Sequence, residues 1–237
     1  MSAGKAAADS SIYCIFDGHG GSEVAQFCYE RMIANLIADS SYSSSTADAI
    51  CRAFLQTDSQ FSKLNSSLNC GSTSLVSVIH NKTIYVGNAG DCRAVLISEN
   101  GLATDLSIDD KPNDEGELKR IEAAGGKVLH WGRWRVEGVL AVSRSIGDIS
   151  LKPFVIPDAR VQTHEIVKGD CFLLMASDGI WDVLTSSQAA KLVIQETDFE
   201  NCARRICLEA ARAGTSDNMT VLVIDLRKAL QEESKTG

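Results

Sequence analysis

Hydrophobic residues along this chain follow two different spacings. Between residues 22 and 64 they recur at about the helical period, which predicts one helix capped by Ser22 and a second capped by Thr46 that ends before Asn69. Short apolar runs bounded by turn residues predict strands in the rest of the chain. The predicted strands are residues 12–16, 75–80, 83–86, 94–98, 160–166, 171–177 and 219–226.

Tight turns between these runs predict how the strands pair. Turns at 81–82 and 88–91 predict a β-meander over residues 75–98, and a turn at 168–170 predicts a hairpin between 160–166 and 171–177. Strands joined in this way are antiparallel, so an α+β fold is expected, with two packed sheets covered by helices. Further helices are predicted at 115–124, 187–196 and 198–213, and residues 127–138 are predicted to form a surface flap.

Composition narrows the class of protein. The chain has 237 residues and 44% hydrophobic content, which favours one domain over 1–237 with its core at 12–226. A net charge of −8 argues against nucleic-acid binding, and no apolar run is long enough for a membrane span. Eight cysteines without a C-x-x-C pair indicate buried thiols in a reducing compartment, so the cytoplasm or nucleus is expected and a zinc site is not.

Five aspartates carry the candidate chemistry, because each follows or precedes an apolar strand. They are Asp17, Asp91, Asp178, Asp182 and Asp217. Each one alone is more simply read as a turn residue, since Asp-Gly pairs form turns well. Strand ends of one sandwich can converge, however, and several carboxylates together suit hard divalent cations, which prefer oxygen ligands.

The run Asp17-Gly18-His19-Gly20-Gly21 adds a second kind of chemistry. A strand that ends here exposes the Gly18 carbonyl and places an imidazole beside the Asp17 carboxylate. Glycines allow a metal or phosphate to approach the backbone. A lone histidine is usually not catalytic, but one flanked by glycines next to a candidate ligand favours a role in catalysis.

Six segments together resemble the metal-dependent type 2C family of serine/threonine protein phosphatases, in the family's order. They are FDGHGG at 16–21, GST at 71–73, VGNAGDCRAVL at 86–96, LAVSRSIGD at 140–148, ASDGIWDVLT at 176–185 and SDNMTVLVI at 216–224. The resemblance spans Ile12 to Leu226 and implies a four-layer αββα sandwich. It also implies hydrolysis of phosphoserine and phosphothreonine in phosphoprotein substrates by a monomer.

The resemblance implies a role for each candidate residue. Asp17 would bridge two Mg²⁺ or Mn²⁺ ions and the Gly18 carbonyl would bind one, while Asp178 and Asp217 would bind the other. Asp91 and Asp182 match the positions that hold a third, weaker ion. The ions would activate a water for in-line attack, and His19 would protonate the departing oxygen.

Other residues in the matching segments receive structural interpretations. Asn218 orients its turn or the neighbouring ligand, or is purely structural. Arg144 is expected to anchor the fold through a salt bridge, and Gly147 and Asp148 are interpreted as turn residues. The flap residues 133–135 either contact substrate or form a surface loop without function.

The chain departs from the family pattern at two places. Family members have an N-terminal strand with a phosphate-binding arginine and an acidic metal ligand, and the sequence predicts that this strand is missing. The family's Asp-His-Lys-Pro reads Asp109-Asp110-Lys111-Pro112 here, and an acid facing the phosphate entrance would repel substrate. An alternative function therefore stays open: a pseudophosphatase that binds a phosphoprotein or kinase without turnover.

Overall fold

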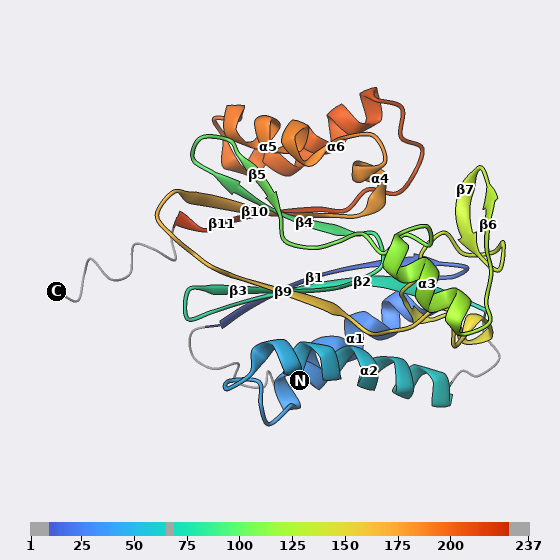
Figure 1. Cartoon of the computed structure of the whole chain (residues 1–237). Coiled ribbons are helices and arrows are strands. Elements are labelled where there is room, and N and C mark those ends of the chain that lie inside the picture. The colour runs from blue at the N-terminus through green and yellow to red at the C-terminus, as the bar shows by residue number, and fades with distance from the viewer. Residues whose placement is uncertain (1–9, 65–68, 228–237) are drawn as a thin grey trace.

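Four layers make up the protein, in the order helices, sheet, sheet, helices (Figure 1). The structure is a computed structural model and describes residues 10–64 and 69–227. The outer helical layers are α1 (Glu23–Ala38) and α2 (Thr46–Leu64) on one side, and α4 (Asp178–Trp181), α5 (Ser186–Gln195) and α6 (Cys202–Arg212) on the other. The predicted αββα sandwich is thus confirmed.

Both sheets are antiparallel. The first has the order β1 (Ser10–His19), β2 (Gly71–His80), β3 (Thr83–Ala89) and β9 (Arg160–Glu165), and β8 (Ile146–Gly147) also pairs with β2. The second has the order β11 (Val221–Asp225), β10 (Asp170–Ala176), β4 (Arg93–Ser98) and β5 (Ala103–Asp105). Two 3-10 turns, η1 (Ile149–Leu151) and η2 (Phe199–Asn201), complete the connections.

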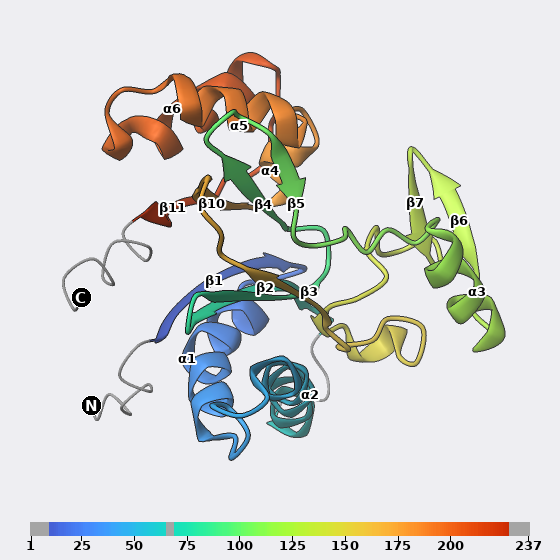
Figure 2. The same cartoon turned by 60° about the vertical axis from the view of Figure 1, so that its left-hand side comes forward.

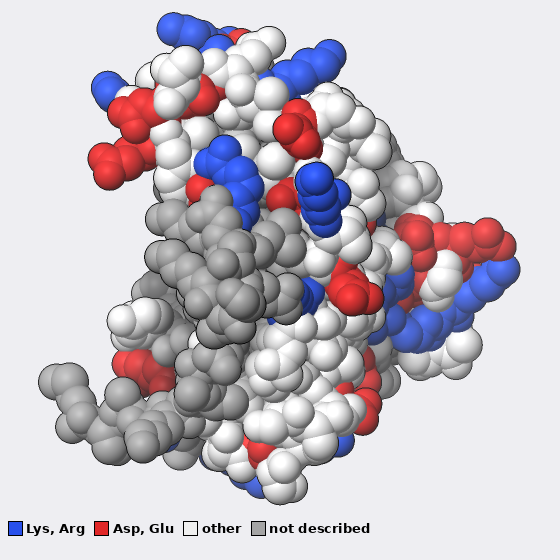
Figure 3. All heavy atoms as spheres, turned by 90° about the vertical axis from the view of Figure 1, so that its left-hand side faces the viewer, with Lys and Arg blue, Asp and Glu red and all other residues white. Residues whose placement is uncertain are grey.

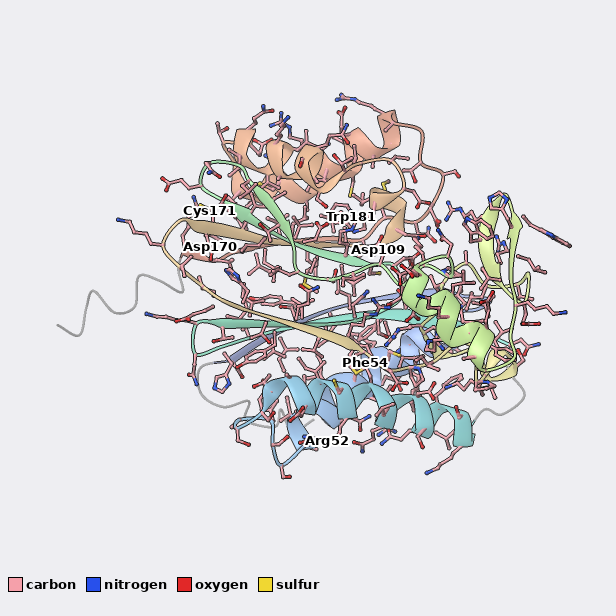
Figure 4. All side chains as sticks on the ribbon, in the orientation of Figure 1. Arg52, Phe54, Asp109, Asp170, Cys171 and Trp181 are labelled. Carbon is pink, nitrogen blue, oxygen red and sulfur yellow. The ribbon has the colours of Figure 1, made fainter. Side chains whose placement is uncertain are left out.

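Alternation of side chains along the strands builds three hydrophobic layers. In β10, Leu173 and Met175 pack between the two sheets, whereas Phe172 and Leu174 face α5 and α6. On the opposite side, Phe54 of α2 is fully buried beneath the first sheet (Figure 4). Each sheet therefore buries both of its faces, which explains why the predicted strands read as nearly continuous apolar runs.

Two predicted strand pairings are wrong. β3 and β4 do not continue one meander, because β3 belongs to the first sheet and β4 to the second. Likewise β9 pairs with β3 and β10 pairs with β4 and β11, so the turn at 168–170 joins two sheets instead of two strands of a hairpin. The Asp170 carboxylate holds this crossing in place by accepting from Val167 N at 2.9 Å.

The helix starts differ in detail from the prediction. Ser22 is the residue before α1, yet its side chain makes no capping hydrogen bond. Thr46 is the first residue of α2, where its hydroxyl donates to the Tyr42 carbonyl at 2.8 Å. Residues 199–201 form η2 ahead of α6, so the last predicted helix is divided.

The predicted flap at 127–138 is a β-hairpin. It consists of β6 (Val128–Trp131) and β7 (Arg133–Val136) and projects from the body beside α3 (Glu115–Ala123) (Figure 2). Its base is anchored, since Val136 is fully buried against Ile121 and Val155, whereas Trp131 near its tip is 74% exposed.

Three sequence-based expectations, on the N-terminal strand, on membrane spans and on surface charge, are tested by the structure only in part or not at all. The predicted absence of a family N-terminal strand concerns residues 1–9, outside the described residues. Within the described ranges, no helix is long and apolar enough to cross a membrane. On the face shown in Figure 3, basic and acidic side chains are interspersed.

Candidate active site

Strand ends from both sheets deliver four of the five candidate aspartates to one cavity. Asp17 lies near the end of β1, Asp91 follows β3, Asp178 begins α4 one residue after β10, and Asp217 precedes β11. The cavity has a volume of about 300 Å³, and these four residues line it together with Gly18, His19, Thr73 and the flap residues Arg133 and Arg135. The structure thus brings together residues that are up to 200 positions apart in the sequence.

Asp182 lies at the rim of this cavity. It comes one helical turn after Asp178, and its backbone N–H donates to the Asp178 carbonyl at 2.8 Å. Its side chain lines a neighbouring groove of about 410 Å³. Arg133 connects the two aspartates, because it contacts Asp182 Oδ2 and lies 4.0 Å from Asp178 Oδ2.

Crowding of the carboxylates changes their ionisation. Burial, and then the negative charges of Asp91, Asp17, Asp182 and Asp217, raise the pKa of Asp178 to about 7. The pKa of Asp17 is also raised, mainly by burial and by Asp217 and Asp91. Such mutual repulsion is expected where several carboxylates face one space without a cation between them.

Two glycines allow the ligand-bearing loops to approach closely. A Cβ at Gly179 would overlap the Asn218 carbonyl, so the turn after β10 packs directly on the turn that carries Asp217. A Cβ at Gly71 would overlap both the His19 ring and the Asp148 carboxylate. These contacts explain why glycine occupies both positions beside the site.

Asp148 is a site residue that the sequence interpretation missed. Its Oδ2 accepts a hydrogen bond from His19 Nε2 at 2.7 Å, and Ser145 Oγ donates to the same oxygen. Asp148 is 6% exposed and has a φ of +45°, so its turn is strained as well as buried. An ionised carboxylate only accepts hydrogen bonds, so Nε2 carries a proton and Nδ1 is the ring nitrogen left for chemistry.

The altered segment at 109–112 does not place an acid in the phosphate entrance. Asp110 is fully buried, its Oδ2 accepts from Gly90 N at 3.0 Å, and its Oδ1 lies 3.0 Å from Arg160 Nε. Burial raises its pKa to about 7, against the opposing effect of Arg144 and Arg160. Repulsion of substrate was expected only if this side chain faced the entrance, and the condition is not met, because Asp110 instead supports the turn that carries Asp91.

Neighbouring residues hold the outer carboxylates. Lys111 Nζ pairs with Asp91 Oδ2. Arg93 links the 109–111 segment to the turn at 178–182, because it donates to Asp109 Oδ2 at 2.8 Å and lies 5.0 Å from the Trp181 ring centroid (Figure 4). Asp109 and Asp91 are thus each held by a neighbouring cation.

Two structural interpretations can be checked directly. Arg144 pairs with Glu117 at 2.7 Å, which confirms its anchoring role. The Asn218 carbonyl accepts from Ser177 Oγ at 3.4 Å, and its N–H donates to Asp217 Oδ1 at 2.7 Å. The backbone of Asn218 therefore joins the two ligand-bearing turns and orients Asp217.

The donor set fits hard divalent cations. Carboxylates and the Gly18 carbonyl are oxygen ligands of the kind that Mg²⁺ and Mn²⁺ prefer, and burial together with the neighbouring carboxylates raises the pKa of both Asp17 and Asp178. Among the described residues, no three His, Cys, Asp or Glu side chains already form a metal cage. Asp91 and Asp182 are instead turned toward Lys111 and Arg133.

Comparison with known proteins defines the class. The family model described as "Protein phosphatase 2C" matches residues 1–219. The chain is 43% identical over 216 residues to "Probable protein phosphatase 2C 52" of Oryza sativa subsp. japonica, covering 90% of this chain and 44% of that protein. It is 40% identical over 215 residues to "Probable protein phosphatase 2C 59" of Arabidopsis thaliana, covering 90% and 69%. The chain belongs to the protein phosphatase 2C family.

Solved structures agree on the fold. A structure titled "Structure of a C.elegans sex determining protein" superposes with a TM-score of 0.85 at 27% identity, covering 92% of this chain and 56% of that one. The serine-threonine phosphatase 2C of Toxoplasma gondii gives a TM-score of 0.84 at 21% identity, covering 92% and 85%.

The chain spans less than half the length of the rice relative.

Proposed function

We propose that this chain hydrolyses phosphoserine and phosphothreonine in proteins with the help of divalent metal ions. One observation carries the proposal: Asp17, Asp91, Asp178 and Asp217 line one cavity together with Gly18 and His19. The family membership supports a phosphatase, and the names of the relatives agree. Phosphoproteins are accordingly the proposed substrates.

The metal ligands are proposed from the family resemblance, and the positions of most of them in one cavity support the assignment. Asp17 and the Gly18 carbonyl lie on β1, and Asp178 and Asp217 approach from the second sheet, so two Mg²⁺ or Mn²⁺ ions would lie between the sheets. Asp91 and Asp182 would hold a third ion at the rim. Such ions, when bound, supply an activated water and offset charge on the phosphoryl oxygens.

His19 is the proposed general acid. It lines the cavity, and its Nε2–H is held by Asp148, so the ring is fixed with Nδ1 available. A serine or threonine alkoxide leaves poorly without a proton, and a placed acid contributes about 10²–10⁴-fold to the rate. Asp148 orients the ring, and the form that would act as the acid is the imidazolium, which donates its Nδ1 proton to the departing oxygen while its Nε2 proton stays on Asp148.

A hydrolysis assay tests this function. The protein and the variant Asp178→Ala are assayed with p-nitrophenyl phosphate and a phosphothreonine peptide in millimolar Mn²⁺, with the exposed and remote Asp198→Ala as the matched control. We expect Asp198→Ala to match the parent and Asp178→Ala to lose at least about 10²-fold. Equal rates for all three proteins would exclude this cavity as the catalytic site.

The same assay addresses the alternative function, binding of a phosphoprotein without turnover. The ion pairs of Lys111 with Asp91 and of Arg133 with Asp182 favour this alternative, because each cation occupies a carboxylate that the proposed third ion would need. A protein that binds the phosphothreonine peptide but never releases phosphate at any Mn²⁺ concentration would establish the alternative.

A further inference from the structure

Arg133 is a cation placed directly on candidate metal ligands. It begins β7 immediately after Gly132, whose φ of +71° makes the sharp turn of the hairpin. Its guanidinium contacts Asp182 Oδ2 and lies 4.0 Å from Asp178 Oδ2. Its side chain is 53% exposed, so the contact closes the rim of the cavity without being buried in it.

A divalent ion and this guanidinium cannot use the same carboxylate oxygens at once. A Mg²⁺ ion that coordinates Asp182 or Asp178 directly needs oxygen contacts at about 2.0–2.1 Å. Arg133 already occupies Asp182 Oδ2, and the two positive charges would repel each other at that distance. The carboxylates at the rim can therefore bind either the Arg133 guanidinium of the flap or a divalent ion from solution.

We propose that Arg133 exchanges with a divalent ion on the Asp178–Asp182 pair and that the displaced guanidinium then binds acidic groups of the protein substrate. The binding of acidic substrate groups rests on the proposed function. The exchange of Arg133 with an ion does not, because it concerns metal binding alone. In this proposal Arg133 determines which protein substrates are preferred. It can do so only after a divalent ion has bound at the rim and released it from Asp182.

The flap is built in a way that permits this exchange. Its base is held by Val136, which is fully buried, whereas Trp131 and Arg133 at the tip are exposed. The tip can therefore shift while the packing at the base is retained. The exposed ion pair between Arg133 and Asp182 itself contributes only about 0.2–1 kcal/mol, so breaking it costs little.

A groove next to the catalytic cavity offers the displaced side chain a place to act. Arg133 and Ala141 line both spaces, so the two are continuous. Lys111 and His130 also line the groove, and Trp134 forms one of its walls. Asp182 lines the groove as well, and the ion that replaces Arg133 would offset its charge. A peptide that places its phosphate in the cavity and continues along this groove would then meet Lys111 and the released Arg133, so acidic residues beside the phosphorylated position fit it best.

Calorimetric titration with Mg²⁺ tests the exchange. Arg133→Gln is compared with the parent and with Arg135→Gln, which removes the same charge from the same hairpin and from the same cavity wall. The Nη1 of Arg135 donates to the Val139 carbonyl, a neutral partner. We expect Arg133→Gln to bind its weakest ion about 2- to 5-fold more tightly than Arg135→Gln, the range that an exposed ion pair corresponds to. Equal affinities for the two variants would overturn the exchange.

Hydrogen exchange provides a readout that does not depend on affinity. In the parent protein, saturating Mg²⁺ should increase amide exchange in residues 130–134, because the tip loses its attachment. In Arg133→Gln the same amides should exchange fast with and without Mg²⁺. Unchanged exchange in the parent would mean that the flap stays attached and would contradict the proposal.

Two phosphothreonine peptides, with acidic and with neutral flanking residues, test the second half. The parent should prefer the acidic peptide in kcat/KM, and Arg133→Gln should reduce this preference about 2- to 5-fold. An unchanged preference would overturn the role in specificity. If neither peptide is hydrolysed by any of the proteins, the proposed function fails, while the calorimetry still decides the exchange.

Discussion

His19 and Asp148 form a partly buried hydrogen-bonded pair, with 2.7 Å between Nε2 and Oδ2, although they are 129 positions apart in the chain. Gly71 makes the pair possible, since a side chain there would collide with both groups. The pair fixes the ring against the cavity and gives His19 a defined orientation for proton transfer.

Asp148→Asn should therefore reduce hydrolysis of a phosphothreonine peptide about 10- to 100-fold, a part of what a placed acid contributes. Hydrolysis of p-nitrophenyl phosphate should change much less, because nitrophenolate leaves without a proton. The comparison of kcat for the two substrates is the measurement, with His19→Ala as the reference for complete loss of the acid. Similar losses on both substrates would indicate that Asp148 acts on folding or metal binding instead.

Repulsion among the carboxylates predicts that the metal-free protein loses stability as pH rises. The pKa of Asp178 is raised from 3.8 to about 7, so between these values the folded chain holds a proton that the unfolded chain has lost. Folding then takes up a proton, and the free energy of unfolding falls as pH rises through this interval. Thermal melts in chelator from pH 4 to pH 8 measure the effect.

Asp178→Asn should flatten this pH dependence and raise the melting temperature at pH 8. A gain of about 1 kcal/mol corresponds to about 2–4 °C in a domain of this size. The variant should lose stabilisation by Mn²⁺ at the same time. A parent protein whose chelated form is equally stable at pH 4 and pH 8 would contradict the account of the cavity charge.

The buried acid at Asp110 is predicted to stabilise the fold. Asp110→Ala leaves Gly90 N without its acceptor and removes a partner of Arg160 and Arg144. Loss of one partner of a buried ion pair costs about 3–5 kcal/mol, which urea unfolding can measure. Asp110→Asn retains an acceptor for Gly90 and should cost less; an equal cost would show that the charge matters more than the hydrogen bond.

The flap should affect large substrates more than small ones. Trp134 lines the groove beside the catalytic cavity and stacks edge-on against His130, with ring centroids 4.9 Å apart. Trp134→Ala should lower kcat/KM for a phosphoprotein roughly fivefold, the effect of about 1 kcal/mol at a contact residue, and leave p-nitrophenyl phosphate unaffected. Trp131→Ala, which removes a more exposed ring of the same hairpin, is the control.

Local sequence features predicted the layers of this fold, but not all of its strand partners. Alternation and turn residues located β9 and β10 within one or two residues. The sequence of the short turn at 168–170, however, does not distinguish a hairpin from a connection between two sheets. The pairing is decided by what covers each face, such as α5 and α6 over Phe172 and Leu174. That information lies in distant parts of the chain.

Site residues could be identified from the sequence where they follow a predicted strand. Residues whose role depends on a contact with a distant part of the chain could not. Asp17 and Asp178 follow apolar runs, so their convergence was expected. Asp148 looked like a turn residue because its partner His19 is distant, and Asp110 looked like an entrance residue because its burial by Arg160 does not show in the sequence.

Calorimetry with Mn²⁺ tests most directly whether the aspartates share bound ions. The parent protein should bind at least two ions per chain, and Asp17→Asn should lose both of the tighter ones, because Asp17 is proposed to touch each of them. Asp198→Ala should bind like the parent. Identical stoichiometry and affinity in the parent and Asp17→Asn would contradict the central claim.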